Sequence, residues 1–417
     1  MHLKTILNRV YRHPGFVYSK YKLTGSSPPI LHVTVKPRGG TKGTCSGCNQ
    51  KAPGYDTLDV RRFEFVPLWG IVVFFYYAMR RVDCPRCGVT VEAVPWATGK
   101  SSLTKAYAYF LAAWAKRMSW NEVAEAFHTS WESVFRSVEM VVEWGLAHRR
   151  LDGIKAIGVD EIHWLKGKFL TVVYQIDQGC IRLLWLGQDR KAKTLLCFFR
   201  WFGRERTKAL RFVCSDMWQP YLKVIAKKAK LALNILDRFH IMANMNKEID
   251  EVRRKEVKDL KAKGLGQVLK NARWTLLKRP ENRTAAQESK LAELVRYNLR
   301  AVRAHLLREE FQQFWEYLSP FWAGTFLDRW CTKVMRSRLE PMKKIARSLR
   351  SHRTLILNWF HARGLVSLGA TEGMNNKAKV ITRRAYGLRT YNAMEVALYH
   401  GLGDLPDPAT QFAHRFC

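Results

Sequence analysis

The sequence contains no hydrophobic run long enough to cross a membrane. Its longest apolar stretch, Phe65 to Met79, falls short of the roughly 20 residues that a spanning helix needs, and Pro67 and Gly70 interrupt it. The N-terminal residues also lack the apolar segment and small-residue cleavage site of a secretory signal. The chain is therefore predicted to have no membrane span and to stay in the cytoplasm.

Acidic residues are scarce in this chain. The 417 residues include 35 Asp and Glu against 71 Lys and Arg, which gives a formal charge of +36 and an isoelectric point near 10.1. Such a chain gains affinity for a polyanion, because each phosphate that it neutralises releases counterions. A membrane surface also attracts basic proteins, but no long basic amphipathic segment dominates here. Nucleic acid is the expected partner.

Only four of the nine cysteines follow a regular spacing. Cys45 and Cys48 form one Cys-x-x-Cys pair, and Cys84 and Cys87 form a second. Two such pairs in Gly- or Pro-bearing turns are typical of one tetrahedral structural zinc ion held by four thiolates. Two disulfides would be unusual in a reducing cytoplasm, and a redox pair would not occur twice. Strand-like runs between the pairs predict a zinc ribbon over residues 1–98.

Residues 99–150 have a helical pattern that resembles a helix-turn-helix. Ser119 is a candidate N-cap with Glu122 three residues later, and Ser130 is placed to open a second helix. An ordinary helical hairpin gives a similar pattern. The neighbouring cysteine pairs and the basic charge favour a DNA-binding unit whose second helix enters a major groove. Its predicted DNA contacts are Ser130, Trp131 and Arg136.

The next segment alternates strand-like and helix-like runs in the order β-β-β-α-β-α-β. Short turns join the first three strands, which predicts an antiparallel meander. This element order is that of a ribonuclease H-like α/β fold, in which the first and fourth strands are neighbours. The predicted strands cover residues 154–164, 168–177, 180–189, 209–216 and 231–240, and the helices cover 192–204 and 218–229.

Two aspartates lie on strands that this element order makes neighbours. Asp160 falls on the first strand and Asp216 at the end of the fourth, so adjacency of these strands would bring the two carboxylates together. Carboxylates bind Mg²⁺, and two ions can bracket the attacking and leaving oxygens of a phosphodiester. Glu372, on a predicted helix from 372 to 384, is the candidate third acid. Glu161 is expected on the opposite sheet face, in a salt bridge, because side chains alternate along a strand.

A long basic helical stretch separates this segment from Glu372. Residues 246–365 are predicted to be an all-α insertion in a catalytic core made of residues 151–245 and 366–400, and residues 401–417 form a tail. Five of its tryptophans are expected in the helical core rather than as platforms for an unstacked base. They are Trp274, Trp315, Trp322, Trp330 and Trp359.

Five blocks of the sequence occur in a characteristic order. They are GVDE at 158–161, SDM at 215–217, LDRFH at 236–240, RWTLLKRPENRT at 273–284 and TEGMNNKAKVITRRAYG at 371–387. In this order they resemble the DDE transposases of bacterial insertion sequences, and within them the ISL-three family. The cysteine pairs and the helix-turn-helix are similar to the DNA-binding region of that family.

The resemblance implies a catalytic triad of Asp160, Asp216 and Glu372, with two Mg²⁺ or Mn²⁺ ions beside the structural Zn²⁺. It also implies binding of double-stranded DNA at terminal inverted repeats, metal-dependent cutting at the ends and joining of the 3′-OH ends to target DNA. Two ends must be paired, which favours a homodimer. A protein that acts on DNA in a bacterium is also expected to associate with the nucleoid.

Further residues near the triad are given supporting roles. Asp237 and His240 are placed to support the site after the fifth strand, and the polar face of the Glu372 helix is predicted to orient Glu372 or to hold DNA backbone. That face comprises Asn375 and Asn376 as supporting residues, and Lys379 and Arg383 as DNA contacts. The neighbouring Arg384 is also a predicted DNA contact.

Two alternatives fit parts of the pattern. A structure-selective nuclease of the same fold needs the metal acids but no sequence-reading region upstream. A non-catalytic DNA-binding regulator derived from a transposase needs no acids, whereas all three are intact here. A regulator would footprint DNA without cutting it, and a junction nuclease would cut branched DNA that lacks any element end.

Overall fold

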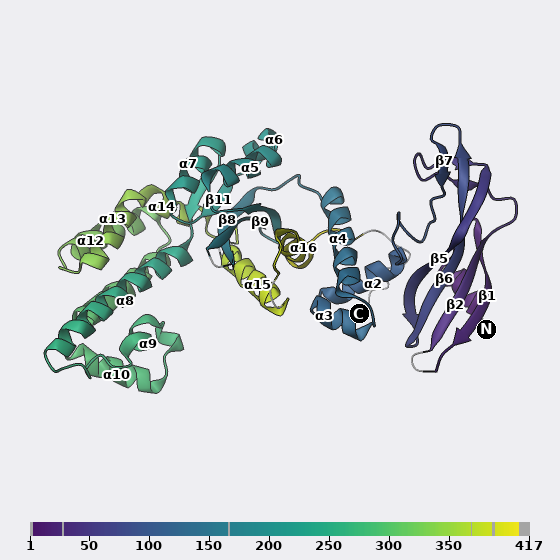
Figure 1. Cartoon of the computed structure of the whole chain (residues 1–417). Helices are drawn as coiled ribbons and strands as arrows, with labels where there is room; N and C mark the ends of the chain where they lie inside the picture. Colours follow the sequence, from purple (N-terminus) through teal and green to yellow (C-terminus); the bar gives the residue numbers. More distant parts are fainter. Residues whose placement is uncertain (1–2, 27–28, 166, 368, 386–387, 408–417) are drawn as a thin grey trace. The chain divides into compact units, whose positions relative to one another are not determined.

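The computed structural model (Figure 1) divides into two compact units. It describes residues 3–26, 29–165, 167–367, 369–385 and 388–407. The first unit comprises Met1–Arg149 and Val380–Cys417, and the second comprises Arg150–Lys379. The chain therefore leaves the first unit, forms the whole second unit and then returns to the first.

The first unit contains a mixed five-stranded sheet. Its strand order is β1-β2-β6-β5, with β7 paired to β6; β2 and β6 are parallel and the other pairs are antiparallel. A short β3-β4 hairpin carries the first cysteine pair. The elements are α1 (Leu3–Val10), β1 (Phe16–Thr24), β2 (Ile30–Pro37), β3 (Gly43–Thr44), β4 (Lys51–Ala52), β5 (Gly54–Leu68), β6 (Ile71–Cys84) and β7 (Gly88–Val91).

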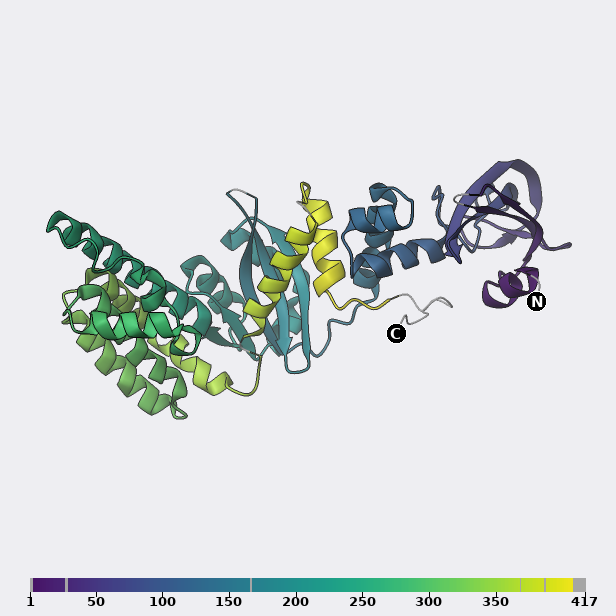
Figure 2. The same cartoon turned by 90° about the horizontal axis from the view of Figure 1, so that it is seen from below.

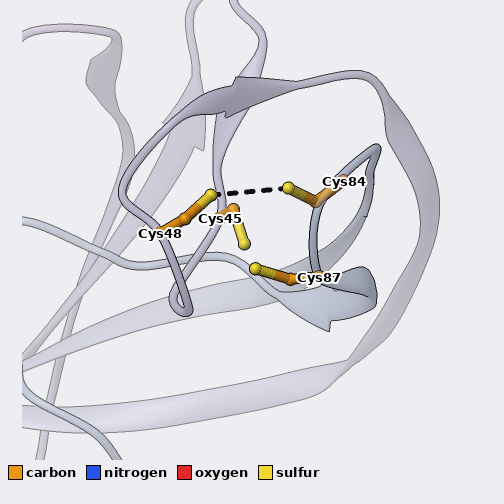
Figure 3. Close-up of side chains that lie close together, drawn as sticks. All are labelled: Cys45, Cys48, Cys84 and Cys87. Carbon is orange, nitrogen blue, oxygen red and sulfur yellow. Dashed lines mark hydrogen bonds between the residues drawn. The ribbon is translucent and has the colours of Figure 1, made fainter.

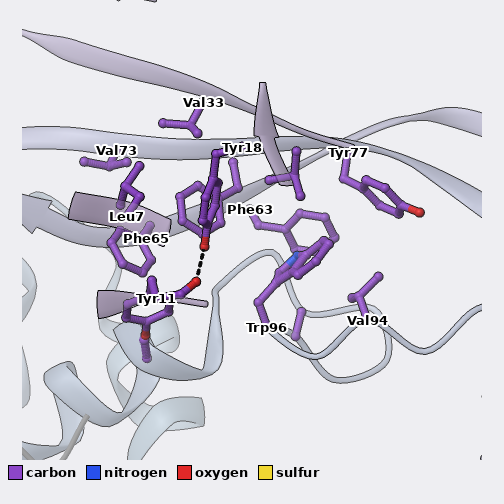
Figure 4. Packing of buried hydrophobic residues seen from close by; sticks show 14 of the residues in the cluster. Leu7, Tyr11, Tyr18, Val33, Phe63, Phe65, Val73, Tyr77, Val94 and Trp96 are labelled. Atoms are coloured by element: carbon purple, nitrogen blue, oxygen red, sulfur yellow. Dashed lines mark hydrogen bonds between the residues drawn. The ribbon is translucent and has the colours of Figure 1, made fainter. Parts of the chain in front are cut away.

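Aromatic side chains fill the core on one face of this sheet (Figure 4). Strand alternation turns every second residue of β2 and β6 inward. The fully buried Trp96 meets Tyr77 edge-to-face at 5.3 Å between ring centroids, and Phe65 stacks on Phe75 at 4.6 Å. Such pairs add to the burial of apolar area, so the cysteine pairs are attached to a well-packed sheet.

Three helices follow the sheet, and a fourth joins them from the C-terminal part of the chain. They are α2 (Lys105–Ala115), α3 (Trp120–Ala126), α4 (Trp131–His148) and α16 (Tyr391–Leu402). The predicted capping box is present: the Ser119 hydroxyl accepts from the Glu122 amide, and the Glu122 carboxylate accepts from the Ser119 amide. Helix α16 packs on α4, and Asn392 donates to Glu139 at 2.8 Å.

The second unit is built on a sheet of order β10-β9-β8-β11-β12. Strands β8, β9 and β10 form the expected antiparallel meander, and β11 is parallel to both β8 and β12. The first and fourth strands of the segment are therefore neighbours, as the element order predicts. The strands are β8 (Ala156–Leu165), β9 (Lys168–Asp177), β10 (Cys180–Gln188), β11 (Phe212–Ser215) and β12 (Leu233–Leu236).

Helices cover both faces of this sheet. On one face, α5 (Ala192–Phe202) and α7 (Gln219–Lys228) pack on Ile157, Val159 and other apolar residues, with the short α6 (Arg204–Ala209) between them in sequence. On the other face, α15 (Ala370–Arg384) lies along β8 and β9 in both views (Figures 1 and 2). Side-chain alternation on β8 therefore directs Gly158 and Asp160 toward α15, and Glu161 toward α5 and α7.

Residues between β12 and α15 form a helical subdomain. Its first helix, α8, starts directly after Asp237 and runs without a break to Ala262, so the predicted boundary at 245/246 falls inside one helix. The Asp237 carboxylate accepts from the Phe239 amide at 2.8 Å and caps α8 there. The helices are α8 (Arg238–Ala262), α9 (Ala272–Leu277), α10 (Ala285–Val295), α11 (Arg300–Gln312), α12 (Pro320–Met335), α13 (Glu340–Ser351) and α14 (Arg353–Ala362).

The tryptophans of this subdomain divide into two groups. Trp315, Trp330 and Trp359 are buried, as predicted. The prediction is wrong for Trp274 and Trp322, which are 55% and 60% exposed. Trp322 lies in the first turn of α12, and Trp274 lies on α9, whose buried side is formed by Ala272, Thr275 and Leu276.

Within the described ranges, none of the helices is both long enough and apolar enough to span a lipid bilayer.

Candidate active site and metal centre

Asp160 lies at the centre of the polar network on the α15 face of the second sheet. It is only 7% exposed. One oxygen, Oδ1, accepts from the backbone amide of Glu161 at 2.8 Å. The other, Oδ2, accepts from the Asn375 side-chain amide at 2.6 Å and lies 3.3 Å from Nε2 of His240. The structure therefore brings together a β8 acid and two predicted supporting residues.

Helix α15 lies close to β8 because residue 158 has no side chain. A Cβ atom built on Gly158 would lie 2.4 Å from Oγ1 of Thr371, which is a clash. Thr371 is buried, and its hydroxyl has no hydrogen-bond partner among the described residues. Close packing of Thr371 against Gly158, and not a hydrogen bond from the Thr371 hydroxyl, therefore holds α15 against β8. This packing places Glu372 and Asn375 beside the sheet.

Tyr174 fixes the orientation of Asn375. The Tyr174 hydroxyl donates to Asn375 Oδ1 at 2.8 Å. An ionised carboxylate only accepts hydrogen bonds, so Asn375 must present its NH₂ group to Asp160 and its oxygen to Tyr174. Tyr174 on β9 and Asp160 on β8 thus hold one side chain of α15 from two sides.

Asp216 belongs to a neighbouring network around Arg190. One carboxylate oxygen of Asp216 accepts from the Trp218 amide at 3.0 Å, and the other lies 3.6 Å from the Arg190 guanidinium. Arg190 also forms an ion pair with Glu161 and lies over the Trp218 ring at 4.5 Å. Glu161 thus lies on the sheet face that strand alternation predicted, and it forms the expected salt bridge.

Negative charge is crowded at this edge of the sheet. Burial raises the pKa of Asp216, and it raises the pKa of Glu161 to about 7 and that of Asp237 to about 6. The charges of Asp160 and Glu372 add to the effect on the pKa of Asp237. The hydrogen bond to Asp160 raises the pKa of His240 to about 9. Nearby anions and burial both disfavour ionised carboxyl groups.

This donor set fits a hard divalent cation. Mg²⁺ and Mn²⁺ prefer carboxylate oxygens and keep several waters, and a cation would stabilise the crowded carboxylates in their ionised form. The acids are not gathered as tightly as the cysteines described below. Within the described part of the chain, no three of their carboxylates have oxygens as close together as the four sulfurs.

The remaining polar residues of α15 differ in their surroundings. Glu372 is half-buried in the first turn, whereas Asn376, Lys379 and Arg383 are exposed, and the Lys379 ammonium lies 3.5 Å from the Asn376 oxygen. Arg384 donates to backbone oxygens at the end of α2, including that of Arg117 at 3.0 Å. These bonds already occupy donors of Arg384 that were expected to contact DNA.

The four paired cysteines form a compact cluster (Figure 3). Their sulfur atoms lie within 4.8 Å of one another, and all four are free thiols. Tetrahedral zinc with bonds of about 2.3 Å places its sulfur ligands about 3.8 Å apart. Gly47 permits this approach, because a Cβ there would lie 3.0 Å from the Cys87 sulfur. The geometry is compatible with one structural zinc ion.

The pKa values of two thiols in this cluster, Cys45 and Cys87, are shifted in opposite directions by their neighbours. The Thr90 hydroxyl, 3.2 Å from the Cys45 sulfur, lowers the pKa of that thiol to about 6. The neighbouring sulfurs, Cys48 first, raise the pKa of Cys87. A divalent cation would stabilise all four thiolates together.

The predicted DNA contacts on α4 lie on its first two turns. Ser130 is the N-cap, and its hydroxyl accepts from the Ser133 amide at 3.1 Å. Trp131 is 42% exposed and stacks on Phe135 with an interplanar angle of 8°. Arg136 is exposed and pairs with Glu132 at 2.6 Å.

Two residues of the acidic site were missed from the sequence. Tyr174 reads as an ordinary buried strand residue, and only the register of β9 against β8 reveals its contact with Asn375. Arg190 follows the third predicted strand at the edge where Asp160 and Asp216 were expected, and this position was an available signal.

Comparisons with known proteins identify the family of this chain. Residues 157–398, more than half of the chain, match the family model of the ISL-three DDE type, described as transposase. A transposase for insertion sequence element IS1557 from Mycobacterium tuberculosis is 30% identical, with 86% of each chain covered. A transposase for IS1001 from Bordetella parapertussis is 26% identical over 86% of this chain and 88% of its own. The chain therefore belongs to the ISL-three family of DDE transposases.

Proposed function

We propose that this protein is the DNA transposase of its own insertion sequence. It binds the terminal inverted repeats, cleaves at the ends by metal-dependent phosphodiester hydrolysis and joins the 3′-OH ends to target DNA. One observation carries the proposal: Asn375 of α15 donates to Asp160 of β8 at 2.6 Å, which ties the helix of Glu372 to the strand of Asp160. The family membership supports the same assignment.

The catalytic acids in this proposal are Asp160, Asp216 and Glu372, on a ribonuclease H-like core. Two Mg²⁺ or Mn²⁺ ions, when bound, supply Lewis-acid stabilisation of the attacking and leaving oxygens. Asp160 is assigned the position that bridges the two ions. Asn375 and Tyr174 hold the Asp160 carboxylate in one orientation, and preorganisation of this kind lowers the reorganisation needed for reaction.

His240 and Asp237 support this arrangement. A protonated His240 beside Asp160 Oδ2 offsets negative charge, and it is assigned to contact the scissile phosphate. Asp237 caps α8 and so fixes the position of His240, which lies three residues later in the sequence. Arg190 is assigned to charge balance, since its guanidinium contacts both Glu161 and Asp216.

The first unit is proposed to read and grip DNA. Its cysteine cluster holds one zinc ion, and α3 and α4 act as a helix-turn-helix with Ser130, Trp131 and Arg136 toward the DNA. Asn376, Lys379 and Arg383 of α15 are exposed and are assigned to backbone contacts or to support of Glu372. Pairing of two ends requires two copies, so the active assembly is proposed to be a homodimer.

A cleavage assay tests the proposal directly. Labelled DNA that carries the inverted repeats flanking the gene is incubated with Mg²⁺ or Mn²⁺, and wild type is compared with Asp160→Asn, Asp216→Asn and Glu372→Gln. We expect metal-dependent cuts at the repeat boundary, reduced by at least roughly 10³-fold in each variant, because a metal carboxylate contributes several kcal/mol to the transition state.

The variants must still bind the repeats for this comparison to be valid, and Lys377→Gln, at an exposed position of α15 with no assigned role, serves as the control. Binding without cutting by the wild type would favour a non-catalytic regulator. Cutting of branched DNA without any repeat would favour a structure-selective nuclease. Wild-type rates in all three acid variants would refute the triad.

A further inference from the structure

A basic groove lies on the α5 and α7 face of the second sheet, opposite α15. It has a volume of about 570 Å³ and is lined by both helices. Leu196 and Val224 contribute apolar side chains, one from each helix, and Arg200, Lys223, Lys227 and Lys228 contribute four positive charges. All four cationic side chains are exposed. None of the residues that line the groove is acidic.

The direction of the groove relates it to the candidate active site. Helix α7 begins three residues after Asp216, and α5 begins two residues after Arg190, so both helices start at the edge of the sheet that carries the acids. The lining on α5 extends from Ala192 to Arg200. At 1.5 Å per residue this is roughly 12 Å, which is about the axial length of three to four phosphates of one DNA strand.

The positive charge of the groove is not neutralised within the protein. No ion pair joins these four side chains to a carboxylate among the residues described. Exposed lysines elsewhere in the same unit do have such partners: Lys208 pairs with Glu205 at 3.0 Å, and Lys333 pairs with Glu310 at 2.8 Å. An unpaired positive patch attracts a polyanion more strongly than a patch of ion pairs does.

We propose that this groove binds the sugar-phosphate backbone of target DNA during joining, which rests on the proposed transposase function. The lining offers lysine ammonium groups, which bind phosphate as point charges. It offers little for reading bases. Its one side-chain amide belongs to Gln219, and the Nε2 atom of that amide already has a hydrogen-bond partner, Nε2 of His352, at 2.7 Å. Backbone contacts position DNA without reading its sequence. Target DNA, of varied sequence, suits such a groove better than a defined terminal repeat.

The test uses the full-length triple variant Lys223→Gln/Lys227→Gln/Lys228→Gln. Its matched control is Lys208→Gln/Lys255→Gln/Lys333→Gln, which removes three exposed, ion-paired lysines from the same unit. The first readout is binding to random-sequence duplex DNA over a range of salt. The second is joining of precut terminal-repeat DNA to a supercoiled plasmid, with end cleavage measured in parallel.

For the groove variant we expect roughly 10- to 100-fold weaker binding to random duplex, and a log–log salt slope smaller in magnitude by about 3. Joining should fall by at least tenfold while end cleavage stays within about twofold of wild type. An unchanged slope relative to the control would overturn the proposal. Equal losses of cleavage and joining would overturn it too, since the groove would then hold the element end. Absence of cleavage in the wild type would refute the transposase proposal instead, and the binding readout would still test the groove.

Discussion

Tyr174 is a buried side chain whose hydroxyl has a specific partner. It donates to Asn375 Oδ1 at 2.8 Å, and Asn375 in turn donates to Asp160 at 2.6 Å. Tyr174→Phe removes the donor and leaves the amide free to rotate. A single hydrogen bond is worth about 0.5–1.5 kcal/mol, so we expect cleavage to slow by roughly 3- to 10-fold. Single-turnover cleavage at saturating DNA measures this.

Tyr221→Phe is a matched control for that change. Tyr221 is also fully buried in the second unit, and its hydroxyl lies 2.7 Å from the Thr171 hydroxyl rather than against Asn375. Both variants lose one buried hydroxyl and should show similar thermal midpoints. If Tyr221→Phe slows cleavage as much as Tyr174→Phe, the effect is one of general stability and not of Asp160 orientation.

At the residue scale, the sequence predicts where Asp160 and Asp216 lie in the fold better than it predicts which side chains contact the acidic site. Asp160 lies within the first strand and Asp216 directly after the fourth, and a period-2 pattern with the element order gives both positions. Tyr174 acts through a contact that depends on the register of β9 against β8, which a single sequence does not reveal. Arg190 directly follows the third predicted strand, and this position could have been used. Trp274 and Trp322 show the converse error, because apolar character favours burial but the packing of neighbouring helices decides it.

At the element scale, the contact of α15 with β8 depends on one glycine. A methyl group on Gly158 would meet Thr371 Oγ1 at 2.4 Å. Gly158→Ala should push α15 away from β8 and weaken the Asn375 to Asp160 hydrogen bond. Overpacking of this kind costs about 1–3 kcal/mol. We expect a lower thermal midpoint and at least roughly tenfold slower cleavage, measured by calorimetry and by the repeat-cleavage assay.

Two further variants make this prediction specific. Gly373→Ala changes a glycine of α15 itself, where a Cβ would meet nothing within 4 Å, and should be neutral or slightly stabilising. Thr371→Ala removes the clashing hydroxyl, which has no hydrogen-bond partner among the described residues, so the double variant Gly158→Ala/Thr371→Ala should recover cleavage. Failure of this rescue would show that Gly158 matters for another reason.

The elements themselves were predicted unevenly. The three strands from 154 to 189 and the helix of Glu372 were predicted within a few residues, since short turns and a polar helix face mark them clearly. Strands β1 and β2 and helix α1 were not identified inside the region assigned to the zinc ribbon. Their alternation becomes meaningful only once β2 is known to pair with β6, about 40 residues away. The start of α8 was misplaced because Asp237 was considered as an acid and not as an N-cap.

At the scale of the whole molecule, the two compact units should respond separately to metal removal. The cysteine cluster lies in a small core with Ala52 and Val82 in the first unit. Loss of a structural zinc ion removes much of the folding free energy of such a small core. We expect about one zinc per chain, and chelation or Cys48→Ser should make residues 43–92 sensitive to protease while residues 150–379 stay protected.

Cys197→Ser is the control for this experiment, because Cys197 is an exposed thiol outside the cluster. It should leave the zinc content and the proteolytic pattern unchanged. Far less than one zinc per chain in freshly purified protein would refute the zinc assignment. Simultaneous cleavage throughout both units after chelation would show that they unfold together.

The return of the chain to its first unit has a consequence for synthesis. Helix α16 packs on α4, and Arg149 lies over the Tyr399 ring at 5.5 Å, yet the 230 residues of Arg150–Lys379 separate the two parts of the unit. At about 5–20 residues per second, the ribosome needs on the order of 10–50 seconds to make that intervening segment. The surface of α4 therefore stays without α16 until residues 391–402 have been synthesised. A chain that stops before residue 391, through a nonsense mutation or a frameshift, lacks α16, so the first unit is completed only when translation has passed that helix.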